Sequence, residues 1–154
     1  MKSKAVTTPL GLMYGRDAIY VDQVHYQYDR RKLLLEGSLN GELGSESDTE
    51  KFVPYQLTFE GVYYFRATEL DLHFALDDME DSENMEGPIE HSNWVEYTDS
   101  PLLRSAREEG KPELQEMRHF VLYTYDDVFK IGCRSYTLKL HTDLNSQSNE
   151  SYTL

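Results

Sequence analysis

The sequence predicts a mainly β protein with a single domain over residues 1–154. It is built as an antiparallel β-barrel or a two-layer β-sandwich of about seven strands with one short helix. Three observations lead to this prediction. Apolar and polar residues alternate in several segments, as they do in strands with one buried face. The chain has 12 tyrosines, a residue type that suits half-exposed sheets. Only one segment carries both the start and the stop signals of a helix.

The N-terminal part is predicted to contain an extended arm and a β-hairpin. Residues 1–15 show no sustained period and form the arm. Residues 19–28 and 33–40 alternate with the strand period on either side of the polar residues 29–32, which predicts two antiparallel strands joined by a turn. Residues 41–51 are polar and predict a flexible connection. The apolar face of the first strand is predicted to carry Tyr20, Val24, Tyr26 and Tyr28.

The middle of the chain contains the clearest strand, residues 53–61. Gly61 interrupts its alternation, and the apolar residues 62–65 then predict a bulge or a sharp bend. Residues 70–76 alternate again, which favours another strand over a helix. A helix is the alternative, because four residues would share one of its sides: Phe65, Glu69, Leu72 and Leu76.

The predicted helix spans residues 101–109 and follows a short strand, residues 92–98, that contains the only tryptophan. Ser100 can accept a hydrogen bond from a free amide at the helix start, and Pro101 suits the first helical position. Gly110 can adopt the left-handed conformation that ends a helix. Its few apolar positions predict a short helix that covers a sheet.

The C-terminal third is the most strand-like part of the chain. Residues 118–125 are apolar on both faces, which predicts a central strand, and residues 126–127 predict a tight turn. Residues 129–140 keep one apolar face only if an extra residue is inserted near residues 134–135, which predicts a β-bulge. Residues 141–154 are rich in Ser, Asn and Thr and predict a flexible C-terminal tail.

The negative charge is concentrated in one segment. The chain has 28 acidic and 15 basic residues and a formal net charge of −13. Eleven of the acidic residues lie between Ala67 and Leu103, where there is no Lys or Arg, so the rest of the chain is close to neutral. Within this segment, residues 77–91 predict an acidic surface loop. Such a charge disfavours binding to nucleic acid and to anionic membranes, because both attract Lys and Arg.

Chemistry-bearing motifs are missing from the sequence. It contains no phosphate-binding glycine loop, zinc-ligand pair or nucleophile elbow, and its five histidines are scattered singly. We therefore predict no catalytic residue, no metal and no cofactor, and we favour a protein that is not an enzyme. The single cysteine, Cys133, is predicted to be a small buried residue. Because one cysteine allows no intramolecular disulfide and no secretory signal is recognised, we predict a cytoplasmic location.

The leading functional hypothesis is a binding protein whose acidic flank meets a basic protein partner. The candidate binding residues are acidic residues of this flank and aromatic residues that follow it: Asp77, Asp78, Asp81, Glu83, Trp94 and Tyr97. The aromatic residues would anchor the partner, and the charge would speed the encounter. The alternative interpretation of the flank is a solvated loop that keeps the protein apart from its neighbours.

Two other classes of function are compatible with the sequence. The first is a ligand-binding or enzymatic barrel whose interior pocket is lined by four residues: His25, Tyr26, His119 and Tyr123. The second is a structural subunit of a homo-oligomer, joined through edge strands that carry exposed tyrosines.

Residues 119–140, HFVLYTYDDVFKIGCRSYTLKL, resemble the closing hairpin of many small bacterial proteins, some of which are thought to be immunity proteins to secreted toxins. Two apolar strands around an Asp-Asp turn are a generic pattern, so the resemblance assigns the chain to no family. It does favour an immunity-like or adaptor-like function, because an acidic protein that blocks a basic toxin would exploit electrostatic steering.

Overall fold

The computed structural model describes residues 2–46, 51–80 and 92–141. The strands in this part of the chain are β1 (Lys2–Ala5), β2 (Ile19–Gln27), β3 (Lys32–Asn40), β4 (Phe52–Glu60), β5 (Tyr64–Glu69), β6 (Trp94–Asp99), β7 (Arg118–Tyr123), β8 (Asp127–Cys133) and β9 (Ser135–Leu140). The α-helices are α1 (Leu70–Glu80), α2 (Pro101–Glu108) and α3 (Pro112–Gln115). The mainly β prediction is confirmed.

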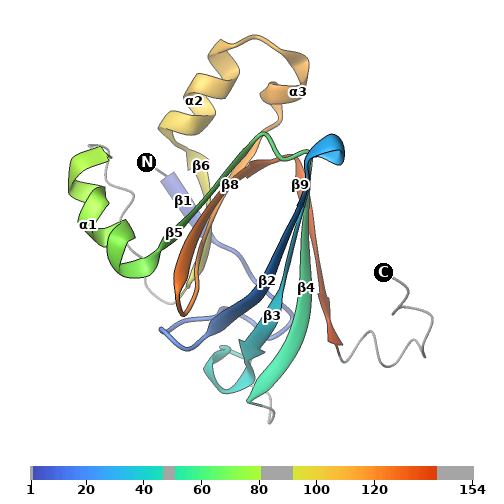
Figure 1. The fold of residues 1–154 in the computed structure, drawn as a ribbon, viewed down its shortest axis with the longest axis vertical. Coiled ribbons are helices and arrows are strands. Elements are labelled where there is room, and N and C mark those ends of the chain that lie inside the picture. The colour runs from blue at the N-terminus through green and yellow to red at the C-terminus, as the bar shows by residue number, and fades with distance from the viewer. Residues whose placement is uncertain (1, 47–50, 81–91, 142–154) are drawn as a thin grey trace.

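The strands form two antiparallel sheets, one in the order β1-β6-β7-β8-β5 and the other in the order β2-β3-β4-β9. The sheets do not close into a barrel, so the sandwich is the observed form of the two that were predicted. Figure 1 shows the helices on the outer side of the five-stranded sheet. The predicted hairpin is confirmed as β2 and β3, and β7 is a central strand between β6 and β8.

Two strands pass from one sheet to the other at a shared corner. β4 continues through Gly61 into β5, and β8 continues through Arg134 into β9. The Arg134 amide donates to the Glu60 carbonyl at 2.9 Å, so the ladder continues around the bend. Gly61 has a φ of 65°, and a Cβ there would lie 2.9 Å from the Cβ of Arg134. The bend at Gly61 and the interruption near Arg134 were both predicted; together they form the corner of the sandwich.

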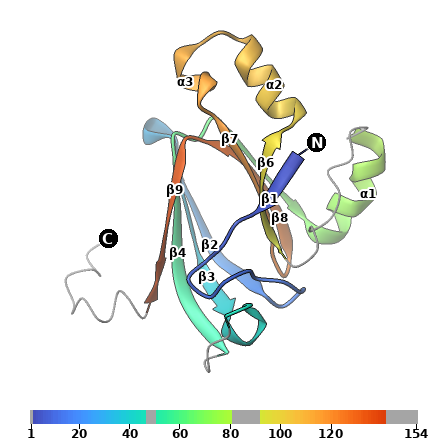
Figure 2. The same cartoon turned by 180° about the vertical axis from the view of Figure 1, so that it is seen from behind.

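The hydrophobic core fills the space between the two sheets. The β4 face predicted to be buried is buried, and it packs against the inner face of β7 and β8. The core contains residues of both sheets, among them Leu35, Leu57, Phe59, Trp94, Phe120, Leu122, Phe129 and Ile131. The segment that follows β1 also enters this core through Leu10 and Met13 (Figure 2). Part of the expected N-terminal arm is an edge strand, because β1 pairs with β6.

The prediction of a strand over residues 70–76 is wrong, because these residues lie in α1. The Glu69 carboxylate accepts hydrogen bonds from the amides of Asp71 and Leu72 at 3.0 and 2.9 Å, which satisfies free donors at the helix start. Leu70 and His73 then face the sheet. Residues 77–80 of the expected acidic loop are instead the end of α1, and its residues 81–91 lie outside the described residues.

The predicted helix is confirmed as α2, with Ser100 as its N-cap. The buried Ser100 hydroxyl accepts from the Leu103 amide at 3.2 Å and shares a hydrogen bond of 2.8 Å with Nδ1 of His119. Gly110 follows with a φ of 72°, as predicted. The predicted C-terminal tail, residues 141–154, lies outside the described residues after His141.

Ser100→Ala is expected to lower the free energy of unfolding by about 1–2 kcal/mol, because it removes the helix cap and a buried hydrogen bond to His119. Urea unfolding followed by circular dichroism measures the change. Ser105→Ala is the matched control, since Ser105 is exposed within the same helix. A cost for Ser100→Ala no greater than that for Ser105→Ala would show that the cap contributes nothing.

Candidate functional site

A hollow of about 230 Å³ lies between α1, the end of β7 and the segment before β2. We call it the α1 pocket. Its lining residues are Tyr14, Gly15, Arg16, Leu70, Phe74, Asn93, Tyr123 and Thr124. The rings of Tyr14 and Phe74 are 48% and 46% exposed, and Leu72 on the same helix is 50% exposed. Large apolar side chains of this exposure, gathered around a hollow, are typical of a binding surface.

The wall of the pocket formed by α1 is held against the five-stranded sheet. The backbone amide of Leu70 donates to the carbonyl of Asp126 at 2.8 Å. His73 is buried, and its ring meets the ring of Tyr123 edge-on with centroids 5.8 Å apart. Leu72 is 50% exposed, whereas Phe74, one turn after Leu70, lines the pocket beside it and is still 46% exposed.

The opposite wall is fixed by the buried side chain of Asn93. Its Oδ1 accepts from the Gly15 amide at 3.1 Å, and its Nδ2 donates to the carbonyls of Gly15 and Tyr123 at 2.6 and 3.2 Å. One amide side chain therefore joins the N-terminal segment to β7. Arg16 lies over the ring of Tyr125 at 4.8 Å, which orders the rim of the pocket.

Acidic residues lie beside the pocket, although none is among the residues that line it. The hydrogen bonds from the amides of Asp71 and Leu72 hold the pKa of Glu69 below its usual value, and nearby Arg16 acts in the same direction. Burial raises the pKa of Asp127, and the neighbouring carboxylates of Asp126 and Glu69 raise it further. Glu69 and Asp127 are cross-strand partners on β5 and β8, and Asp126 is joined through its carbonyl to the amide of the lining residue Leu70, so three acidic residues lie next to this end of the pocket. Arg16 is the single base among the residues that line the pocket.

The residues proposed from the sequence are only partly brought together. Asp77 and Asp78 belong to the C-terminal part of α1, whereas Asp81 and Glu83 lie outside the described residues.

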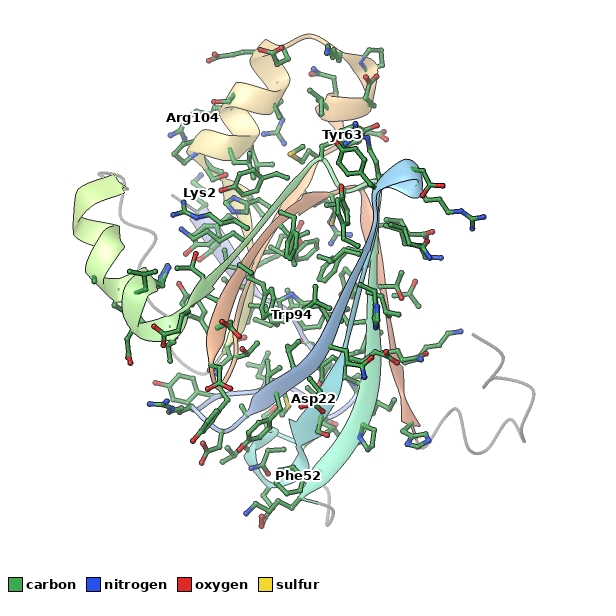
Figure 3. The ribbon with its side chains drawn as sticks, viewed as in Figure 1. Lys2, Asp22, Phe52, Tyr63, Trp94 and Arg104 are labelled. Carbon is green, nitrogen blue, oxygen red and sulfur yellow. The ribbon has the colours of Figure 1, made fainter. Side chains whose placement is uncertain are left out.

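Trp94 and Tyr97 are buried residues, only 2% and 4% exposed, so neither is available as an anchor on the surface. Figure 3 shows Trp94 between the two sheets. Sequence reasoning missed Tyr14 and Phe74, since Tyr14 lies in an irregular segment. Phe74 was assigned to a strand.

The four residues of the predicted interior pocket do not share a cavity. His25 is on the outer face of the four-stranded sheet, and Tyr26 is at its β2 edge. His119 and Tyr123 are buried on the outer face of the five-stranded sheet. The space between the sheets is filled by the apolar core.

Two groups with reactive chemistry are buried. The Ser100 hydroxyl and His119 imidazole form a hydrogen-bonded pair, but they are 0% and 3% exposed and the hydroxyl caps α2. Burial raises the pKa of the Cys133 thiol to about 12, as expected of a small core residue. Within residues 2–46, 51–80 and 92–141, no group of three His, Cys, Asp or Glu side chains could hold a metal ion.

The outer face of the four-stranded sheet carries shallow polar hollows. Three adjoining ones, of about 390, 200 and 220 Å³, all include Gln56. In the hollow of about 390 Å³, Gln56 Nε2 donates a hydrogen bond to Glu36 Oε2 at 3.1 Å. This face is typical of an antiparallel sheet with one solvated side.

Comparisons of this chain with profiles of protein families, with curated proteins and with solved structures found no match. No helix in the described part of the chain is long and apolar enough to cross a membrane. The fold and the α1 pocket together define the class: a small open β-sandwich with an apolar pocket on one flank and acidic residues beside it.

Proposed function

We propose that this chain is a non-enzymatic binding protein that holds a basic protein partner at the α1 pocket, in the manner of an immunity or adaptor protein. The observation that carries the proposal is the position of two exposed aromatic rings, Tyr14 and Phe74, beside a cluster of carboxylates. Aromatic anchors in a pocket supply most of the affinity of an interface, and surrounding charges set the encounter rate and the choice of partner.

The charge around the pocket supports a basic partner. Glu69 and Asp71 stand at the start of α1, and the helix continues with Asp77, Asp78 and Glu80. The complementary surface is an apolar side chain flanked by Lys or Arg. Such a segment places its apolar group against Phe74 and its positive charges near the carboxylates. We place this binding in the cytoplasm, because the only cysteine of the chain is a buried free thiol.

The test begins with capture of partners from native lysate at low and high salt, followed by identification of the bound protein. Phe74→Ser is expected to weaken the affinity for that protein by about 30-fold, the effect of losing one anchor residue. Asp71→Asn combined with Asp126→Asn is expected to slow association at low salt several-fold and to flatten its salt dependence, because both exposed carboxylates attract the partner. Stopped-flow mixing measures the rate.

The matched control is Phe52→Ser. Phe52 is 51% exposed, as Phe74 is 46% exposed, but it lies at the far end of β4, remote from α1 (Figure 3). Phe52→Ser should leave the affinity unchanged. If Phe74→Ser and Phe52→Ser weaken the affinity for the captured partner equally, or if neither changes it, the partner binds elsewhere and the proposal is contradicted. Capture of no basic protein at low salt contradicts it as well.

A further inference from the structure

The free edge of β2 exposes apolar side chains. β2 pairs only with β3 in the described structure and ends the four-stranded sheet. Residues 22–31 are all exposed. Val24 and Tyr26 pair with the core residues Leu35 and Leu33, on the inner face of the sheet, yet they are 43% and 36% exposed. The sequence predicts a buried apolar face here, and the five-stranded sheet covers it only in part: the ring of Tyr26 lies 6.1 Å from that of Phe65 on β5, and its hydroxyl donates to the Val62 carbonyl at 3.4 Å.

The exposed stretch of this edge is self-complementary. A bulge between Val21 and Gln23 interrupts the strand, and the regular part that follows reads Gln23, Val24, His25, Tyr26 and Gln27. This order of polar, apolar, His, apolar and polar residues is the same in both directions. If a second copy ran antiparallel about His25, Val24 would meet Tyr26 and Gln23 would meet Gln27, each pair on one face of the sheet.

We propose that a second copy of this chain pairs with the β2 edge over residues 23–27, in antiparallel register about His25. The pairing joins both four-stranded sheets into one continuous sheet and satisfies backbone groups on the free edges. The two-fold axis gives two equivalent cross-strand pairs, in each of which Val24 of one copy contacts Tyr26 of the other. Both pairs bury apolar surface that is exposed in the single chain.

The charges on the edge support a second copy as the occupant. Asp22 precedes the regular stretch, and Arg30 follows it. In this register Asp22 of one copy lies opposite Tyr28 of the other, two positions before Arg30. The helix α1, which carries four acidic residues and no Lys or Arg, lies against the other sheet, so its charge adds little repulsion at this edge (Figure 1).

The first test is the mass in solution. Sedimentation equilibrium of the full chain is expected to give twice its mass of 18.0 kDa, and Val24→Lys is expected to give 18.0 kDa. Val24 is 43% exposed, so the substitution leaves the fold intact, which circular dichroism verifies. Thr58→Lys, on the outer face of β4, is the matched control and should keep the dimer. A mass of one chain at the highest soluble concentration overturns the proposal. It would also be the result if β2 paired with a strand of a different protein and not with a second copy.

The second test reads the register. His25→Cys places a thiol on the two-fold axis, opposite the same residue of the second copy and at a Cα separation that a disulfide can span. Mild oxidation is expected to give a covalent dimer in high yield. Cys133 does not interfere, because it is buried. Thr58→Cys is the control and should stay monomeric on a denaturing gel. If the protein has the mass of a dimer but His25→Cys gives no covalent dimer, this register is wrong. Equal yields of covalent dimer for His25→Cys and Thr58→Cys would contradict it as well.

Discussion

Trp94→Ala is expected to lower the free energy of unfolding by about 3–5 kcal/mol, the usual cost of truncating a large buried aromatic side chain. Trp94 is 2% exposed on β6, and its ring lies 6.3 Å from Phe120 of the same sheet and 5.0 Å from Tyr136 of the other sheet. One side chain thus connects both layers, and the resulting cavity lies at their interface. Because small domains are stable by only about 5–15 kcal/mol, this variant should be close to unfolding at 37 °C.

Trp94→Phe is the control for this prediction. The indole Nε1 is buried and has no hydrogen-bond partner in the described structure, so its loss removes an unsatisfied donor. The phenyl ring keeps part of the volume, and a cost of about 1–2 kcal/mol is expected. Urea unfolding monitored by far-ultraviolet circular dichroism gives both values. A loss below about 1 kcal/mol for Trp94→Ala would mean that the two sheets do not pack through this residue.

Arg118→Met is expected to lower the free energy of unfolding by about 2 kcal/mol at neutral pH. Arg118 donates from Nε and Nη2 to the two carboxylate oxygens of Glu96, at 2.8 Å each. The Glu96 side chain is 9% exposed and that of Arg118 is 39% exposed. Removing one partner of a fully buried pair costs about 3–5 kcal/mol, and the exposure of Arg118 reduces this value. Lys4, whose Nζ lies 3.8 Å from Glu96, compensates for part of the loss.

The cost of Arg118→Met should depend on pH. Burial alone would raise the pKa of Glu96, but the hydrogen bonds and the charge of Arg118 outweigh it and hold the pKa below its usual 4.5. A lowered pKa stabilises the fold above the unfolded-state pKa, and this stabilisation is lost as the pH falls through the folded-state pKa. The variant should therefore differ most from the parent protein at neutral pH and least in acid. Urea titrations at several pH values measure the difference.

Two further variants separate charge from packing at this pair. Glu96→Met combined with Arg118→Met leaves no unpaired buried carboxylate and is expected to recover most of the stability lost by Arg118→Met alone. Arg104→Met removes the exposed ion pair with Asp99, in which both side chains are 45% and 48% exposed, and should cost less than about 0.5 kcal/mol. If the double variant were less stable than Arg118→Met, the Glu96 carboxylate would stabilise the fold without Arg118, through its remaining partner Lys4, whose Nζ lies 3.8 Å away.

Local spacing predicted most of the strands because it reports on backbone preferences. The alternation in residues 53–61 identified β4 and its buried face, and Ser100, Pro101 and Gly110 identified α2 through capping. The phase slip near Arg134 was also visible in the sequence. The sequence did not show what this phase slip does. A residue inserted to bend one strand gives the same pattern in the sequence as a corner at which the chain passes from one sheet to the other.

The assignment of residues 70–76 failed for a different reason. Leu70, Leu72 and Phe74 alternate as in a strand, but β5 already ends at Glu69, whose carboxylate caps the start of α1. The Glu69 carboxylate can accept from the amides of Asp71 and Leu72 only when the chain leaves the sheet and turns into a helix. The alternation of apolar residues does not report this interaction. Two apolar residues of the expected strand, Leu72 and Phe74, are therefore exposed beside the α1 pocket.

The sequence by itself determined a mainly β chain, the place of the capped helix and the concentration of charge between Ala67 and Leu103. Only the tertiary structure decided which apolar faces are covered. Trp94 is buried because β9 lies across from β6, whereas Val24 is exposed because the five-stranded sheet stops short of β2. A residue's neighbours along the chain set the direction of its side chain, but its burial depends on distant segments that only the fold brings into contact.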